Sequence, residues 1–520
     1  MPTSAFQNSN QLQIGAVFTP LEWAEFAICQ FDLFGKWLSG KTIFDPTMGE
    51  GNLLEALVRV GLKKGFRLED LPISRLFGAE LNTDYFERFF LKMKTLYGLE
   101  MPGENFKNAD IFFLEREQSF DIIFGNPPWQ NFADLPETYK QRLKPKFFEY
   151  DLVGNARDLL LGGSRIDLSA LVIQKTIEKN LKTDGEAVFF MPLSLLLNDG
   201  ANKHFRTYRV NGTHFRIETV FDFNDAPVFE GVATRHGLVK FVRDARQIFP
   251  LSFKRWENGV WTDYTAKPAF HANDPLSVSA LEEEDAMADF EPIVLPKTAT
   301  PRQGVNTCGA NDWFFFDHYE ILDEHLCAVT VSDELVLEGD KKVILPRRYV
   351  YPLLTNKNFR EVKPQPYKWA LLPYLPNGRP LEPHQVLADK NLSNYLLNNR
   401  KHLENRKGTM LSAWLNKGYW YALLGVGDYN FYPWKIVWEA YGKTSFEPRI
   451  FEGNWQANQS LQAYIPVKSR QEAEDILEKL RDKRIENYLR SLKMEGTMNW
   501  AQPGKIKKLV RLQEEVMTLF

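Results

Sequence analysis

The first half of the chain alternates short apolar runs with segments of helical periodicity. The apolar runs fall at residues 43–44, 75–81, 120–124 and 185–192, and between them apolar residues recur every three or four positions. Continuously apolar strands that alternate with helices are typical of a parallel sheet whose two faces are both covered. This half is therefore predicted to be a doubly wound α/β domain with a mainly parallel sheet.

The alternation fades in the second half. Residues 279–304 combine an acidic cluster with Pro, Thr and Gly, a composition typical of a linker. The chain beyond is rich in Trp, Tyr, Pro and Asn, and a long helical pattern covers residues 470–494. We predict one domain over 1–275, a linker over 276–300, and a mixed α+β domain over 301–520 that ends in a helical segment.

The composition is that of an ordinary globular protein. Of 520 residues, 44% are hydrophobic and 25% are charged, no apolar run approaches the length of a membrane span, and residues 1–13 do not form a signal peptide. Cys29, Cys308 and Cys327 are scattered and odd in number, which favours a reducing compartment over a disulfide framework. The His residues are dispersed without an H-x-x-x-H pair, so we expect no metal site. From the apolar runs and the cysteines we expect no membrane association and a cytoplasmic location.

The charge is unevenly distributed along the chain. The net charge is −3, but residues 341–449 contain about 18 Lys and Arg residues and only about 7 Asp and Glu residues. Neutralising nucleic-acid phosphates requires an excess of this kind, although a solvated basic face would have the same composition. Aromatic residues interleaved with these cations are candidates either for stacking on bases or for the core: Trp414, Trp420, Tyr421, Trp434 and Trp438.

A glycine loop follows the first predicted strand. The strand leads to Asp45-Pro46, then to Gly49 and Gly51, and then to a helical pattern. Glycines at the carboxyl end of a strand let the backbone approach a ligand closely, and open α/β sheets bind their ligands there. The dinucleotide fingerprint requires a third Gly or Ala at the position of Leu54, so the loop favours a smaller, nucleoside-like ligand.

Two acidic residues lie at the ends of later strand-like segments. Glu80 ends one of them, about thirty residues after the glycines, and can accept hydrogen bonds from both hydroxyls of a ribose. Asp110 ends a further short segment and can accept from the exocyclic amine of an adenine ring. Either acid alone is typical of a solvated surface, but as a series behind a glycine loop they indicate a nucleoside site.

The segment FDIIFGNPPW at 120–129 is the most specific motif in the chain. Pro127 and Pro128 fix their own φ and keep the residues before them out of the helical region, which gives a rigid extended corner at a strand end. The corner directs the Asn126 side-chain oxygen and the Pro127 carbonyl into one small space. There they can hold both protons of an amine whose lone pair is delocalised into a ring. Trp129 offers a flat face for an extruded base.

In this order the motifs resemble the amino-methyltransferases of DNA, in the group whose cofactor motifs precede the catalytic tetrapeptide and whose target-recognition region is C-terminal. The resemblance implies a Rossmann-like methyltransferase fold with a mainly parallel seven-stranded sheet, followed by a DNA-recognition domain. It implies that S-adenosylmethionine is bound by Thr19, Pro20, Asp45, Pro46, Gly49, Gly51, Glu80, Asp110 and Ile111. It also implies a catalytic tetrapeptide and two aromatic contacts to the target base: Asn126, Pro127, Pro128 and Trp129, with Trp129 and Phe229 stacking.

The resemblance implies methyl transfer to N6 of a flipped adenine in double-stranded DNA, in a restriction-modification or phage-defence setting of a prokaryotic cell. An amino-cytosine enzyme of this family would more often have Ser in place of Asn126. RNA adenine methyltransferases, protein glutamine methyltransferases and a catalytically silent recognition subunit remain alternatives. No nuclease motif is found, so we expect any cleavage to come from a separately encoded endonuclease or defence subunit. Residues 130–165 match no part of the family pattern.

Overall fold

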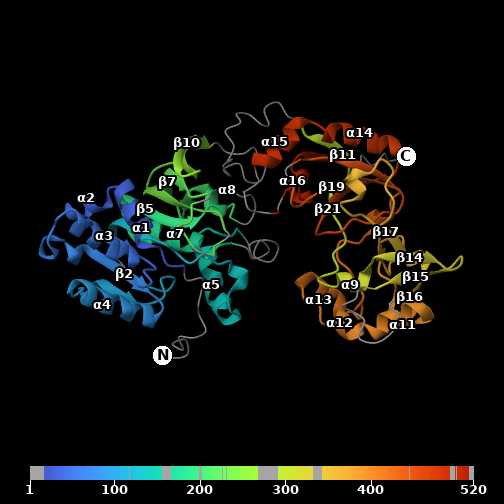
Figure 1. Cartoon of the computed structure of the whole chain (residues 1–520), viewed down its shortest axis with the longest axis horizontal. Helices are drawn as coiled ribbons and strands as arrows, with labels where there is room; N and C mark the ends of the chain where they lie inside the picture. The colour runs from blue at the N-terminus through green and yellow to red at the C-terminus, as the bar shows by residue number, and fades with distance from the viewer. Residues whose placement is uncertain are drawn as a thin grey trace. The chain divides into compact units, whose positions relative to one another are not determined.

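The chain divides into two compact units, whose main parts are Met1–Glu284 and Asp285–Arg490 (Figure 1). A computed structural model describes residues 17–115, 118–154, 166–197, 202–224, 226–229, 231–232, 234–266, 291–331, 342–443, 445–491, 498 and 500–513. Within these ranges, no helix has the length and apolar character needed to cross a membrane.

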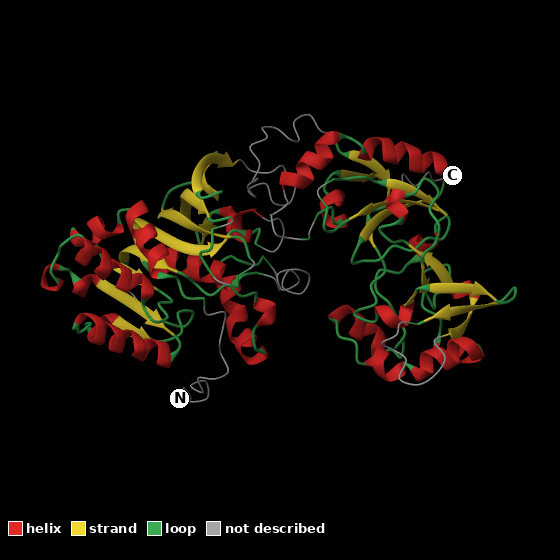
Figure 2. Cartoon of the chain, in the orientation of Figure 1, coloured by secondary structure: helices red, strands yellow, loops and turns green. Residues whose placement is uncertain are grey.

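The first unit is built on one large sheet with helices packed on both faces (Figure 2). Its strands, in spatial order, are β10 (Val260–Ala266), β9 (Leu251–Glu257), β7 (Thr213–Asp222), β8 (His236–Arg243), β5 (Leu181–Pro192), β4 (Phe120–Gly125), β1 (Ile43–Asp45), β2 (Leu76–Glu80) and β3 (Phe106–Asn108), with β6 (Arg209–Val210) paired to β7. The run from β5 to β3 is parallel, whereas β8 is antiparallel to both β5 and β7. The predicted mainly parallel methyltransferase fold is confirmed, but the described sheet has ten strands rather than the expected seven.

The two faces of this sheet carry separate hydrophobic cores. Neighbouring strand residues alternate between them, so that Ile43 and Ile122 belong to one core while Phe44 and Ile123 belong to the other. The first core is completed by α1 (Leu21–Gln30), α2 (Leu33–Leu38), α3 (Asn52–Lys63) and α4 (Thr83–Tyr97), and the second by α5 (Glu137–Glu149), α7 (Leu168–Lys179) and α8 (Ser194–Leu197). Burial on both faces explains why the predicted strands are continuously apolar.

The additional strands β9 and β10 form an antiparallel hairpin at the sheet edge. Its two turn residues, Asn258 and Gly259, have positive φ values of 52° and 86°, as a tight hairpin turn requires. These strands do not form continuous apolar runs, because their polar and apolar residues are mixed. The Asn258-Gly259 pair is the sequence feature that indicates this hairpin.

The second unit contains smaller sheets. Among the described residues they are β11 (Ile293–Pro296) with β22 (Val510–Gln513); β12 (Arg302–Gln303), β21 (Gln462–Val467), β19 (Trp434–Glu439) and β20 (Arg449–Glu452); β13 (Phe315–Phe316), β18 (Lys368–Leu371) and β17 (Val350–Leu353); and β14 (His318–Ile321), β15 (Leu326–Thr330) and β16 (Lys342–Pro346). Its helices are α9 (Asn311–Phe314), α10 (Pro383–Ala388), α11 (Lys390–Asn398), α12 (Arg400–Glu404), α13 (Thr409–Leu415), α14 (Arg470–Leu480), α15 (Lys483–Ser491) and α16 (Pro503–Lys507). The predicted mixed α+β character is confirmed. Of the predicted linker over 276–300, only 291–300 is described, and it contains β11, a strand of this unit.

The predicted helical pattern over 470–494 corresponds to two helices rather than one. Helix α14 ends at Leu480, and α15 begins at Lys483. The Asp482 carboxylate accepts the backbone N–H of Arg484 at 2.9 Å, a contact that favours a new helix start over continuation. Residues 492–494 lie outside the described residues.

Part of the basic excess in this unit has a structural role. Trp420, Tyr421 and Trp438 are buried, at 6% exposure or less, and so belong to the core rather than to a base-stacking surface. The Arg406 guanidinium is also buried and donates to three backbone carbonyls. Lys435, on β19, is fully buried. These cations are therefore unavailable to phosphates, and any phosphate contacts must come from the exposed ones.

The buried Lys435 predicts an unusual pH dependence of stability. Its Nζ donates to the carbonyl of Tyr432 at 3.0 Å, and burial lowers the pKa of this amine to about 7. The unfolded chain, with a Lys pKa of about 10.4, binds more protons between pH 7 and 10, so the folded state gains stability as pH rises through this window. We expect Lys435→Met to stabilise the protein at pH 7 and to remove up to about 1.4 kcal/mol per pH unit of this dependence. Urea unfolding at several pH values measures it, with the exposed Lys401→Met as control; equal pH profiles for the two variants would contradict the assignment.

Candidate active site

The glycine loop lies where β1 ends and α3 begins. Gly49 and Gly51 have φ of +54° and +75°, and a Cβ on Gly49 would fall 2.8 Å from the Phe18 ring. The Glu80 carboxylate, at the end of β2, accepts the backbone N–H of Gly49 at 2.8 Å and that of Asn82 at 2.7 Å. Burial raises the pKa of Glu80. Glu80 therefore fixes the loop, and because each carboxylate oxygen has two lone pairs, it can still accept from a ligand.

The start of the same loop contacts the corner that carries Asn126. Asp45 is 1% exposed, and its Oδ1 accepts the backbone N–H of Thr47 at 3.1 Å. Burial raises the pKa of the Asp45 carboxyl well above its usual range. Pro46 lies against the end of β4, where a Cβ on Gly125 would fall 3.2 Å from its ring. The Thr47 hydroxyl donates to the backbone carbonyl of Asn126 at 3.3 Å, so the predicted cofactor loop and the tetrapeptide form one site.

Asp110 follows β3 and is held from two sides. Its Oδ1 accepts the backbone N–H of Phe112 at 3.0 Å, and its Oδ2 accepts the Tyr139 hydroxyl at 3.0 Å. Burial raises the pKa of Asp110, and the neighbouring Ile111 is 5% exposed. Tyr139 lies on α5, within the segment that matched no family pattern. Its spacing of four from Leu143 predicts a buried helix face but not this contact.

The Asn126 carboxamide is the most constrained polar group of the site. Its Nδ2 donates to the Val17 carbonyl at 2.9 Å and to the Thr19 hydroxyl at 3.1 Å. Its Oδ1 is buried and has no hydrogen-bond partner among the described residues. Thr19 is 3% exposed, and Pro20 directly precedes α1. The site therefore presents an oriented acceptor whose hydrogen-bonding capacity is unused.

The rings of Trp129, Phe229 and His236 contact one another, and Trp129 follows Asn126 by three residues. The centroids of Trp129 and Phe229 are 4.9 Å apart, with the ring planes at 85°. The His236 ring contacts both, at 5.3 Å from Trp129 and 5.0 Å from Phe229. Trp129 Nε1 and His236 Nε2 are buried without partners among the described residues. The structure thus brings Trp129 and Phe229, the two rings predicted to stack on a base, into contact with each other and with His236.

His236 was not identified from the sequence, where its position seven residues after Phe229 is the only signal. Its Nδ1 lies 2.8 Å from the carbonyl of Thr234. Because a carbonyl only accepts, Nδ1 carries the proton of the neutral ring and Nε2 is left as an acceptor. Burial lowers the pKa of His236, which favours the neutral ring.

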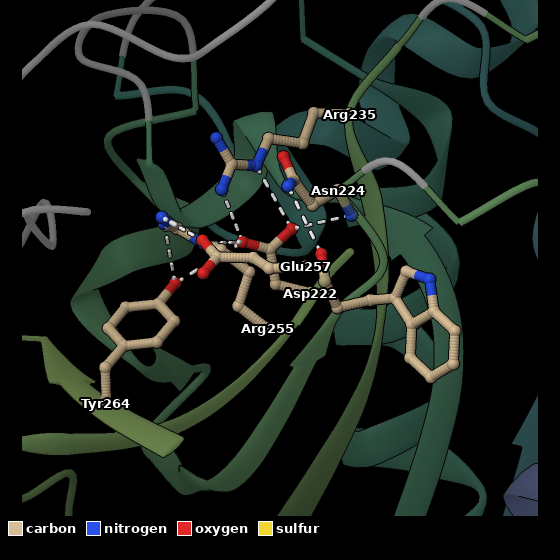
Figure 3. Close-up of polar contacts among 7 residues, drawn as sticks. Asp222, Asn224, Arg235, Arg255, Glu257 and Tyr264 are labelled. Carbon is tan, nitrogen blue, oxygen red and sulfur yellow. Dashed lines mark hydrogen bonds and ion pairs between the residues drawn. The ribbon is translucent and has the colours of Figure 1, made fainter. Parts of the chain in front are cut away.

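A buried charge network anchors the chain that carries Phe229 (Figure 3). Asp222, the last residue of β7, is fully buried and accepts from Arg235, which directly precedes β8, with Nε to Oδ1 at 3.1 Å. Arg255 on β9 donates to Asp222 Oδ2 at 3.1 Å, and the Tyr264 hydroxyl on β10 lies 3.4 Å from the same oxygen. Asp222 thereby joins the two ends of the connection between β7 and β8, and the β9–β10 hairpin contacts the same carboxylate.

Comparisons with known proteins find similarity to methyltransferases of restriction-modification systems. Residues 27–229 match the model of the Eco57I restriction-modification methylase family. The Type II methyltransferase M.HincII of Haemophilus influenzae is 23% identical over 237 residues, which cover 45% of this chain and 38% of that protein. The Type II methyltransferase M.NspV of a Nostoc species is 22% identical over 475 residues, covering 85% of this chain and 86% of that protein. The predicted resemblance to methyltransferases of restriction-modification systems is confirmed.

A solved structure extends the likeness in fold to the second unit. The Type IIL restriction-modification enzyme MmeI, solved in complex with DNA, superposes with a TM-score of 0.57 at 14% sequence identity. The superposition covers 92% of this chain and 64% of that one. The chain therefore spans less than two thirds of MmeI, and little more than a third of M.HincII.

The buried network of Asp222 predicts an effect on stability that surface ion pairs do not have. Arg255→Met removes charged hydrogen bonds from a buried carboxylate, and we expect it to lower the free energy of unfolding by about 1.5–3 kcal/mol. The matched control is Lys254→Met on the same strand, whose partner Asp263 is 78% exposed; there we expect less than about 1 kcal/mol. Urea unfolding compares the two variants. Equal losses would show that the network contributes no more than a surface pair.

Proposed function

We propose that this protein is an S-adenosylmethionine-dependent DNA methyltransferase that methylates N6 of adenine. The observation that carries the proposal is the Asn126 carboxamide, whose nitrogen is held by Val17 and Thr19 while its buried oxygen has no partner among the described residues. An adenine N6 amine has two donors and a lone pair delocalised into the ring. An oriented acceptor in a buried site is what such an amine needs in order to react.

The residues around the glycine loop suit the cofactor. Gly49 and Gly51 have positive φ values and leave two positions of the loop without a side chain, Glu80 would accept from the ribose hydroxyls, and Asp110 would accept from the adenine amine. The remaining contacts are proposed for residues that line the same strand ends: Thr19, Pro20, Asp45, Pro46 and Ile111. When bound, S-adenosylmethionine supplies a methyl group on a positively charged sulfur, so the chemistry needs no metal from the protein.

The base would be held by the tetrapeptide and the rings beside it. Extruding an adenine from the duplex costs a few kcal/mol of stacking and pairing. The base would stack on one of the rings of Trp129 and Phe229 and meet the other with its edge, which recovers part of this cost, while Asn126 Oδ1 and the Pro127 carbonyl accept the two N6 protons. Holding both protons favours a tetrahedral nitrogen and frees its lone pair for methyl transfer. Pro128 keeps the corner rigid, so the acceptors do not reorganise during the reaction.

We assign DNA binding to the second unit. M.HincII and M.NspV are Type II methyltransferases, and MmeI was solved with DNA. Exposed lysines on or next to α11, α12 and α13 can neutralise phosphates, whereas the buried cations cannot. A restriction-modification or defence role in the cytoplasm of a prokaryotic cell is part of this proposal, with cleavage supplied by a separately encoded endonuclease.

The central experiment is to express the protein in a methylase-free bacterial host and sequence the DNA by a method that reads modified bases. We expect N6-methyladenine in one short sequence context.

Asn126→Ala should lower the transfer rate about 10²-fold or more while leaving cofactor affinity nearly intact, because one preorganised polar group is lost from the transition state. Glu80→Ala is the matched contrast, and it should weaken cofactor binding by about 1.5–3 kcal/mol. N4-methylcytosine would replace the proposed base, an absence of modified DNA would contradict DNA as the substrate, and full activity of Asn126→Ala would refute the assigned chemistry.

A second experiment tests the DNA-binding surface. Replacing the exposed Lys390, Lys401 and Lys407 by Ala should weaken duplex binding and flatten the log–log dependence of affinity on salt by up to about 0.9 per lost phosphate contact. The control makes the same charge change in the first unit, with Lys41, Lys64 and Lys94 replaced by Ala. Fluorescence anisotropy over a range of salt concentrations compares the two. An unchanged slope in the first variant places DNA binding elsewhere.

A further inference from the structure

The orientation of the Asn126 carboxamide is set by the segment that precedes α1. Both hydrogens of Nδ2 are used, one by the Val17 carbonyl at 2.9 Å and one by the Thr19 hydroxyl at 3.1 Å. Turning the amide by half a rotation would place Oδ1 against the Val17 carbonyl, which can only accept. The observed orientation is therefore the one that satisfies both neighbours, and it leaves Oδ1 as the free acceptor.

Thr19 is itself held by a chain of contacts that runs into two helices. Its carbonyl accepts from Nδ2 of Asn52, the first residue of α3, at 3.0 Å. Oδ1 of the same Asn52 amide accepts from Lys92 Nζ on α4 at 2.9 Å. Lys92 is ion-paired at 2.8 Å with Glu55, whose side chain is 3% exposed and also accepts the Tyr97 hydroxyl at 2.7 Å.

We propose that Thr19 is a positioning residue that fixes the acceptor face of Asn126, and that Asn52 and Lys92 hold Thr19 for this purpose. The inference rests on the proposed methyl-transfer function. It differs from the contact to S-adenosylmethionine that the resemblance implies for Thr19. If Thr19 contacts both the cofactor and Asn126, the segment before α1 positions the methyl donor and also orients Asn126 Oδ1, the oxygen that accepts from the amine.

A double-mutant cycle between Thr19 and Asn126 separates this role from cofactor binding alone. Thr19→Val keeps the shape of the side chain but removes the oxygen that accepts from Nδ2, whereas Thr19→Ser keeps it. At saturating cofactor and DNA, we expect Thr19→Val to lower the single-turnover transfer rate about tenfold and Thr19→Ser to restore most of it. In the Asn126→Ala background, Thr19→Val should change the rate by less than about twofold, since the group it orients is gone. An equal loss in both backgrounds would overturn the proposal.

The contribution of the helices is tested on α4. Lys92→Met combined with Glu55→Gln removes the ion pair without leaving a buried charge. Like Thr19→Val, this double variant should lower the transfer rate. Lys94→Met is the control on the same helix, because Lys94 is 67% exposed and pairs only with the exposed Glu100 in the described contacts. A normal rate in the Lys92→Met/Glu55→Gln protein would remove Lys92 from the proposal.

A readout that needs no methyl transfer keeps the inference distinct from the proposed function. In full-length protein labelled with ¹⁵N-asparagine, the side-chain signal of Asn126 is assigned as the one that disappears in Asn126→Ala. Two buried hydrogen bonds should slow exchange of its protons with water, and Thr19→Val should accelerate exchange of one of them. Unchanged exchange would overturn the inference. If exchange responds as expected but the wild-type protein methylates no nucleic acid, the proposed function fails while the positioning contact stands.

Discussion

The site depends on which end of one side-chain amide faces the reaction space. The oxygen and nitrogen ends of a carboxamide have nearly the same shape, so only hydrogen bonding distinguishes them. For Asn126 the distinction comes from Val17, a carbonyl that accepts and cannot donate. For the amine substrate proposed above, an amide in the opposite orientation would offer donors where acceptors are needed. The two residues are 109 positions apart, so the orientation of the amide depends on tertiary structure rather than on the tetrapeptide alone.

The parallel part of the sheet supplies that tertiary structure. Because parallel strands end at one edge, the loops after β1, β2 and β4 lie together. Glu80 then reaches the backbone N–H of Gly49, and the Thr47 hydroxyl reaches the carbonyl of Asn126. Each contact joins one loop to the next, so that the glycine loop, Glu80 and the corner at Asn126 are fixed relative to one another. Burial on both faces stabilises the strands that carry these loops.

Sequence reasoning identified the features of this site that are local in the chain. Gly49, Glu80 and Asn126 each stand in a short segment whose residue types indicate their chemistry, and the central strands are visible as apolar runs. It did not identify Tyr139, Asn52 or His236, because each acquires its place through a partner far away in sequence. The hairpin of β9 and β10 was missed because its strands are not continuously apolar. The sequence does not assign Trp420, Tyr421 and Trp438 to the core, because a segment that mixes aromatic residues with cations has the same composition whether its aromatic residues are buried or exposed.

The arrangement of the rings constrains how a base can bind. Trp129 and Phe229 contact each other at 4.9 Å with perpendicular planes, which leaves no space for a base to be sandwiched between them. A flat base can instead stack on one ring and present its edge to the other. For this to be a defined corner, Phe229 must be held before the base arrives, and the connection that carries it is closed at both ends by Asp222 and Arg235. Preorganisation of this kind reduces the entropy lost on binding. If Phe229 contacts a base as proposed, the buried charge network would act on base recognition through the position of Phe229, without itself touching the substrate.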